Sequence, residues 1–250
     1  MTEFPGDRHV VLVGDGVAEL DEQQLVAAAG GERLNEAQQV RVVKATTTTL
    51  SRAAEDSASN VPPEVRPAPE DGIVARDVWR HEARVQGLVP GDNPPYRVVS
   101  LSVRSFAGSG TFRLGPAALP WEGQRILLTS DHQAMINTPA NLQLVAETIG
   151  EIDAVFLAGD LVNIPDRASK WFDDTRGSAF FPVLQGNGAR AGSNGITYQG
   201  AEIIQNAPIF PAIGNPRGAG PARRGYVVER VLQRGGPPAR GGGGVRRHRR

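Results

Sequence analysis

Two short apolar runs, in RILLTSDHQ at 125–133 and DAVFLAGD at 153–160, are separated by a segment that carries the signals of a helix. Thr138 is a suitable N-cap, Pro139 suits position N1 in the first turn, and Gly150 suits the C′ position after the last turn. One face of this helix is apolar, with Leu142, Val145 and Ile149. A strand–helix–strand unit of this length predicts two parallel strands in an α/β sheet. Because both runs are continuously apolar, we expect the strands to be covered on both faces.

The chain before this unit has a different character. Residues 41–120 contain β-branched runs such as YRVVSLSVRSF and most of QVRVVKATTTTL, which starts at residue 39, separated by turns rich in Pro and Gly. This pattern is typical of a β-sandwich, and HEARVQGLVPGDNPPYRVVS resembles part of a fibronectin-type-III-like domain. The segment LGPAALPWEGQ predicts a domain boundary near residue 120. Residues 1–40 are expected to form a separate strand, turn and helix.

Composition excludes some classes of site and compartment. The 250-residue chain has no cysteine, so disulfides and thiolate metal sites are ruled out. No apolar run reaches the ~18 residues of a membrane span, and no secretory signal is visible at the start. We therefore expect a cytoplasmic protein without a membrane partner. An extracytoplasmic location stays open if the N-terminus is misassigned.

Polar residues follow each apolar run where the predicted strands end. Asp131 and Gln133 follow the first run, Asp160 and Asn163 follow the second, and Asn215 follows a third candidate strand at 209–213. Ligands of open α/β sheets bind outside the carboxyl ends of the strands. Carboxylate and amide oxygens suit hard or borderline divalent metals. Each residue taken alone also fits a structural role, as a turn, cap or loop residue.

The ordered set resembles the first three motifs of the calcineurin-like metallophosphoesterases. These are Asp131-x-Gln133, Gly159-Asp160-x-x-Asn163 and Gly214-Asn215. The resemblance covers about residues 123–215, and a preceding sandwich is typical of the purple-acid-phosphatase-like members. It implies an incomplete α/β metallophosphoesterase fold over residues 121–215, preceded by the β-sandwich.

The resemblance also implies a two-metal centre that hydrolyses a phosphate ester. Asp131 and Gln133 would bind one metal, Asp160 would bridge both, and Asn215 would bind the second. Asn163 would support the site, and His132 receives no role. The ions would be two divalent or trivalent metals, with Mn, Fe, Zn and Mg all compatible.

The pattern breaks immediately after Asn215. The family places a histidine there, but this chain has Pro216, which has no side-chain donor. The later Gly-His-x-His motif is absent, and the single histidine beyond Asn215 is His248. Residues 216–250 are rich in Arg and Gly, and we expect a largely disordered tail. A frameshift, a truncated paralogue with an added tail, and a functional RGG-like tail would each explain the change.

Two functions follow from these observations. The first is a metallophosphoesterase whose activity is impaired because the later histidines are missing, with no catalytic residue assigned. The alternative is a non-catalytic binding or scaffold protein. Its basic tail, with RGG at 234–236 and 240–242, would contact nucleic acid weakly through phosphate groups.

Overall fold

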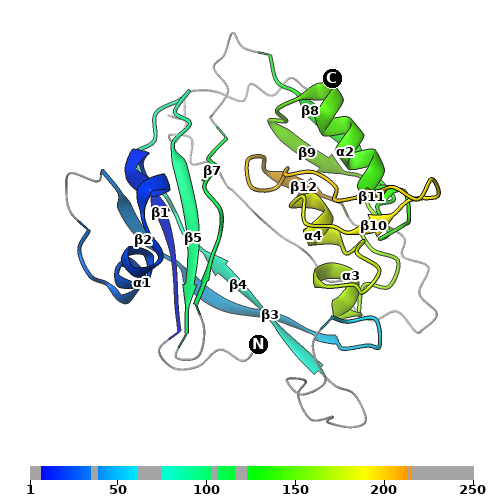
Figure 1. Cartoon of the computed structure of the whole chain (residues 1–250), viewed down its shortest axis with the longest axis horizontal. Coiled ribbons are helices and arrows are strands. Elements are labelled where there is room, and N and C mark those ends of the chain that lie inside the picture. Colours follow the sequence, from blue (N-terminus) through cyan, green and yellow to red (C-terminus); the bar gives the residue numbers. More distant parts are fainter. Residues whose placement is uncertain are drawn as a thin grey trace, which may run out of the picture.

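The computed structural model describes residues 7–34, 39–60, 75–102, 106–115, 123–212 and 214. These residues form a mixed, sheet-rich fold with few helices (Figure 1). The described strands fall into a larger antiparallel sheet, a long two-stranded ribbon, a parallel sheet and a small hairpin. Asn215, Pro216 and the predicted tail at 216–250 lie outside the described residues. None of the helices in the described ranges has the length and apolar character needed to cross a bilayer.

The antiparallel sheet has the strand order β2-β1-β5-β6, and β7 also pairs with β5. Its strands are β1 (Arg8–Val13), β2 (Arg41–Lys44), β5 (Pro95–Leu101), β6 (Phe106–Gly108) and β7 (Phe112–Arg113). A 3-10 helix, η1 (Asp15–Glu19), and α1 (Glu22–Gly30) follow β1. Alternate residues of β1 are buried, because Val10 and Leu12 pack with Leu25 of α1 and Val99 of β5. Strand β1 therefore pairs with β2, which begins one residue beyond position 40.

Helix α1 begins at a capping box that the sequence specifies locally. The Asp21 carboxylate accepts a hydrogen bond from the Gln24 amide at 2.8 Å, and the Asp21 amide donates to the Gln24 side chain at 3.0 Å. The helix ends at Gly31, whose φ of 96° lies in the left-handed region. These caps satisfy backbone groups at both ends of a helix that is only nine residues long.

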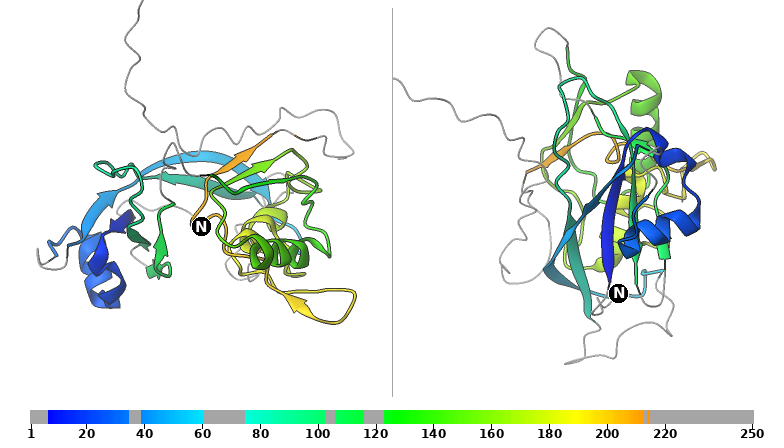
Figure 2. Two further views of the ribbon diagram at one scale, coloured as in Figure 1. Left: turned by 90° about the horizontal axis from the view of Figure 1, so that it is seen from above. Right: turned by 90° about the vertical axis from the view of Figure 1, so that its left-hand side faces the viewer.

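A long ribbon connects the antiparallel sheet to the second half of the chain (Figures 1 and 2). It consists of β3 (Thr46–Ala54) and β4 (Ala75–Glu82), paired antiparallel with an irregularity between Thr49 and Ser51. Within the described ranges this ribbon joins no further strand. The predicted strands are therefore present, but a β-sandwich of 41–120 is not confirmed, since their pairing separates them into a sheet and a ribbon.

Charged side chains attach the ribbon to helix α3 (Ala168–Phe172). Arg76 of β4 contacts the Asp173 carboxylate at 2.8 Å and the Glu55 carboxylate at 3.4 Å. At α3 itself, Lys170 and Asp174 form a separate, buried ion pair at 2.8 Å. The pair between Arg76 and Asp173 joins the ribbon to the end of α3. The other two pairs hold the ribbon end and the α3 segment internally.

The parallel sheet has the strand order β12-β9-β8. Its strands are β8 (Ile126–Thr129), β9 (Ala154–Leu157) and β12 (Ile209–Pro211). Leu127 lies opposite Val155, and Val155 lies opposite Ile209. Helix α2 (Thr138–Ile149) connects the first two strands, which confirms the predicted strand–helix–strand unit. The connection from β9 to β12 contains α3, α4 (Phe180–Leu184) and the hairpin of β10 (Arg190–Ala191) and β11 (Thr197–Tyr198).

The second core lies on one face of this parallel sheet. Leu127, Val155 and Leu157 pack there against Leu142 of α2 and Phe180 of α4. The chain crosses the sheet in one direction, from β8 to β9 to β12. Two right-handed connections that advance in the same direction lie on the same side of a sheet. Both helical connections therefore cover one face.

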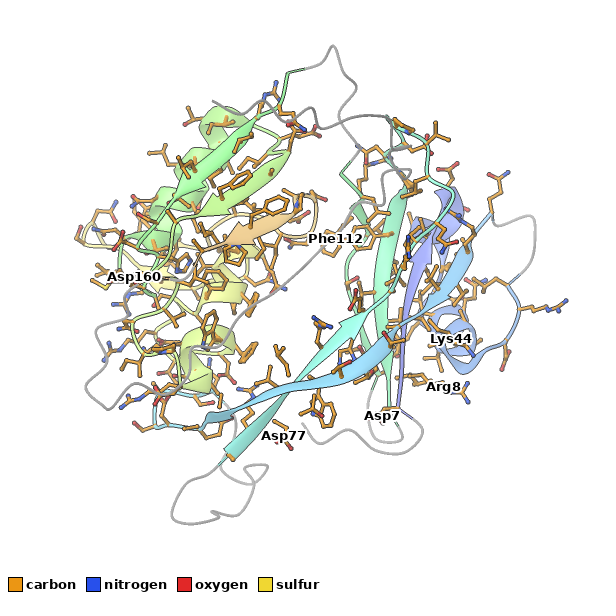
Figure 3. The ribbon with its side chains drawn as sticks, turned by 180° about the vertical axis from the view of Figure 1, so that it is seen from behind. Asp7, Arg8, Lys44, Asp77, Phe112 and Asp160 are labelled. Atoms are coloured by element: carbon orange, nitrogen blue, oxygen red, sulfur yellow. The ribbon has the colours of Figure 1, made fainter. Side chains whose placement is uncertain are left out.

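The prediction that these strands are covered on both faces is wrong for the described residues. The side chains on the other face are exposed: Ile126 by 50 %, Leu128 by 73 %, Phe156 by 41 % and Phe210 by 40 %. Figure 3 shows α2 behind the strands when the molecule is viewed from this side. A continuously apolar run does not reveal whether a second layer exists, so the sequence could not distinguish the two cases.

The limits of α2 predicted from the sequence are nearly correct. The helix ends before Gly150 and has a proline in its first turn, as predicted, but the N-cap residue is Asn137. Thr138 instead donates its hydroxyl to the carbonyl of His132 at 2.8 Å. Leu142 is buried, whereas Ile149 at the last turn is exposed. The helix start is therefore connected to the loop that follows β8.

Candidate functional site

The loops after β8 and β9 are in direct contact. The Asp131 amide donates to the carbonyl of Gly159 at 3.3 Å, and the Gln133 amide donates to the carbonyl of Asp160 at 3.2 Å. These two backbone hydrogen bonds continue the pairing of the parallel strands beyond their ends. The first two sequence motifs are thus adjacent, as the position of both at strand ends predicted.

The end of the third strand reaches the same place. The Ala212 amide donates to the carbonyl of Leu157 at 2.7 Å, and the chain then brings Gly214 against Asp160. A Cβ atom at Gly214 would overlap the Asp160 amide nitrogen and Oδ1, and would lie 2.7 Å from its Cα. Only glycine allows so close an approach. The residue after this contact, Asn215, lies outside the described part of the chain.

The backbone at these loops is unusual. Asp131, Gln133, Ala134 and Asp160 have φ values of 52°, 46°, 52° and 51°. They are four of the five non-glycine residues with positive φ in the described ranges. Such conformations are sparsely populated by L-residues, and they gather at functional sites, where surrounding contacts hold them in place.

Asp160 is half-buried at the centre of this arrangement (Figure 3). Its Oδ2 accepts a hydrogen bond from Nε2 of Gln133 at 3.2 Å, which joins two predicted ligands. Its Oδ1 is buried and accepts no hydrogen bond from the described residues. Oδ1 of Asn163 is likewise buried and accepts no hydrogen bond from the described residues. Buried oxygen acceptors without donors are costly, and a bound cation is one kind of partner that such an oxygen accepts.

Asp131 differs from Asp160 because its side chain is exposed. Ser130 donates its hydroxyl to Oδ2 of Asp131 at 2.7 Å. The site therefore combines a solvent-facing carboxylate with a half-buried one. Neither carboxylate is paired with a Lys or Arg side chain among the described residues, so neither negative charge is already neutralised there.

The donor set is one of oxygens. Within the described ranges no group of three or more His, Cys, Asp or Glu side chains is arranged to hold a metal ion. The site instead offers two carboxylates and two amides, from Asp131, Asp160, Gln133 and Asn163. This chemistry fits hard or borderline cations bound through oxygen, although the structure shows the donors of only two of the three motifs.

His132 is buried beneath the loop and has a structural role that the sequence did not reveal. Its ring lies edge-on to Phe180 with the ring centres 4.9 Å apart, and Nδ1 accepts a hydrogen bond from the Ala134 amide at 3.4 Å. Burial lowers the pKa of His132 to about 4, so the imidazole is neutral at pH 7. Nδ1 can therefore act as the acceptor that holds the turn at Ala134.

Ser178 is a second residue that sequence reasoning missed. It is buried beside α4, and its hydroxyl donates to the carbonyl of Ala134 at 3.0 Å. Together with Thr138 and His132, it fixes the loop that carries Asp131 and Gln133. No local pattern marks Ser178, because its partner is 44 positions away in the chain.

No protein-family model matches the sequence, and the search of curated proteins finds no significant match.

Proposed function

We propose that this chain is a metallophosphoesterase-like protein with an incomplete metal centre. The observation that carries the proposal is the meeting of the β8, β9 and β12 ends at Asp160, whose buried Oδ1 accepts no hydrogen bond from the described residues. Three segments that are distant in sequence supply the motifs that resemble this family. The finer fold assignment, half of an α/β metallophosphoesterase domain, is part of the same proposal.

In this proposal Asp131 and Gln133 would hold one metal ion, Asp160 would serve both ions, and Asn215 would help to hold the second. Bound metal ions would supply Lewis-acid stabilisation of phosphoryl oxygens and a more acidic water. The hydrogen bond from Nε2 of Gln133 to Asp160 leaves the Gln133 Oε1 atom as its acceptor for a cation. Asn163 supports the site with its buried Oδ1.

The remaining residues keep the ligands in position. His132, Ser178 and Thr138 hold the strained loop between Asp131 and Ala134 through the contacts described above. Gly214 permits the third strand to approach Asp160. These residues act on the geometry of the ligands and are therefore positioning residues.

We expect phosphate-ester hydrolysis by this chain to be weak or absent. Pro216 replaces the histidine that the family uses for leaving-group protonation or transition-state stabilisation, and the later Gly-His-x-His motif is missing. The substrate class is a phosphate ester, and the ions are drawn from Mn, Fe, Zn and Mg.

Hydrolysis of p-nitrophenyl phosphate tests this proposal. We expect slow, metal-dependent turnover or none, with any activity removed by Asp160→Ala and by a chelator. Turnover that is unchanged by Asp160→Ala would show that another site acts, and the proposed site would be rejected. Fast turnover that depends on Asp160 would show that the missing histidines are not needed.

The alternative function is a binding or scaffold protein with a basic tail. Its support is the sequence of residues 217–250, which contains ten arginines and one acidic residue. Such a segment would bind nucleic acid through phosphate contacts, and its affinity would fall steeply with salt. Removal of residues 217–250 should abolish RNA binding under this alternative, whereas Asp160→Ala should leave it unchanged. The opposite pattern, with metal binding lost in Asp160→Ala, supports the enzyme-like function.

A further inference from the structure

The uncovered face of the parallel sheet is a continuous apolar surface. Its outward residues come from all three strands: Ile126, Leu128, Ala154, Phe156 and Phe210. The strand register places Leu128, Phe156 and Phe210 in one row across the sheet. Phe156 and Phe210 stack with their ring centres 4.9 Å apart. We call these five residues the bare face.

Parallel sheets are normally covered on both sides, because their crossover connections place helices on each face. Here both described connections cover the same side, so the described residues leave the bare face without a second layer. Its four large side chains expose the equivalent of about two whole apolar side chains, or about 400 Å². A contiguous apolar patch of this size is typical of an interaction surface.

We propose that the bare face is the contact surface between two copies of this chain. The first reason is charge, since no residue of the bare face is charged. Two copies can therefore meet face to face without burying an unpaired charge. The second reason is symmetry. Phe156 lies on the central strand, and Leu128 and Phe210 lie on the strands either side of it.

A twofold axis in the contact plane, parallel to the strands and passing over Phe156, makes this row self-complementary. It places Phe156 against Phe156 of the second copy and Leu128 against the second copy's Phe210. Each contact is then made twice, as an isologous interface requires. The two sheets would pack about 10 Å apart, which is the usual spacing for sheets joined by apolar side chains.

The area of the contact indicates a weak association. Two copies would bury about 800 Å² in total, below the roughly 1,200–2,000 Å² of stable protein complexes. We therefore expect a weak, reversible dimer that forms as concentration rises. The carboxyl ends of the strands, where Asp160 lies, are separate from this face. Self-association and metal binding can thus be measured independently.

Sedimentation velocity of the full chain over a roughly 100-fold concentration range is the first test. The native chain should shift reversibly from monomer towards dimer, and Phe156→Asp should weaken dimerisation by about tenfold or more. The matched control is Leu144→Asp, which changes a residue that is 62 % exposed on α2, away from the bare face. It should leave the association unchanged. Aggregation that both substitutions reduce equally would overturn the proposal.

A cysteine substitution gives a milder second test, because the native chain has no cysteine. A short bis-maleimide should crosslink Phe156→Cys into a dimer, since the two copies of residue 156 would face each other across the axis with their strands about 10 Å apart. Leu144→Cys should not be crosslinked. Two results would overturn the proposal. A monomeric Phe156→Cys variant whose thiol reacts freely with maleimide would show that the face stays bare. A monomeric variant whose thiol is protected would show that part of the same chain covers it.

Discussion

Gly214→Ala is the substitution that tests the meeting of the strand ends without any metal. The added Cβ would overlap two atoms of Asp160 and lie 2.7 Å from a third, its Cα. Ordinary contacts of a Cβ atom are longer than 3.4 Å, and two of these three obstacles are backbone atoms that cannot rotate away. The β12 end must therefore move by about 1 Å, and overpacking of this kind destabilises a fold by about 1–3 kcal/mol.

Thermal unfolding provides the assay. For a domain of 150–250 residues each kcal/mol lowers Tm by about 2–4 °C, so we expect a loss of about 2–12 °C. Gly123→Ala is the matched control, because nothing lies within 4 Å of the Cβ it would add, and its Tm should change by less than about 2 °C. A Gly214→Ala protein that melts with the native chain would refute the close approach and, with it, the convergence of the third motif on Asp160.

Two further predictions concern the rest of the fold. Lys170→Met leaves Asp174 buried without its ion partner, and it should destabilise the chain by about 3–5 kcal/mol in urea unfolding. Adding Asp174→Leu should recover much of this loss. Equal losses in the single and double variants would contradict the prediction. Burial raises the pKa of Tyr96 to about 12, so the unfolded chain loses this proton first, and stability should fall between pH 10 and pH 12. Tyr96→Phe should make the loss of stability between pH 10 and pH 12 less steep. An unchanged pH dependence would contradict the role given to Tyr96.

The parallel unit could be predicted because its signals are local. Apolar runs mark β8 and β9, while Pro139 and Gly150 mark the limits of α2. The pairing of the first half of the chain could not be predicted in the same way. The threonine-rich run of β3 indicates a strand, but it does not say that β4 is its sole partner within the described ranges. Composition likewise could not show that β1 joins β2 and β5.

The candidate site could also be predicted only in part. Position at the strand ends was enough to predict that Asp131, Gln133 and Asp160 lie together, and they do. The residues that hold the loop, His132 and Ser178, have roles that depend on contacts across the fold. No sequence pattern encodes those contacts. Asn215, Pro216 and the domain limits at 40, 120 and 215 stay as predictions from the sequence.

A calorimetric titration of the full chain with Mn²⁺ tests the metal site most directly. The native chain should bind the ion, and Asp160→Asn should lose that binding, because the half-buried carboxylate becomes neutral. Asp153→Asn is the matched control, since Asp153 precedes the same strand and lies at the opposite end of the sheet. It should bind as the native chain does. Binding that survives in Asp160→Asn, or a native chain that binds no ion, would contradict the account.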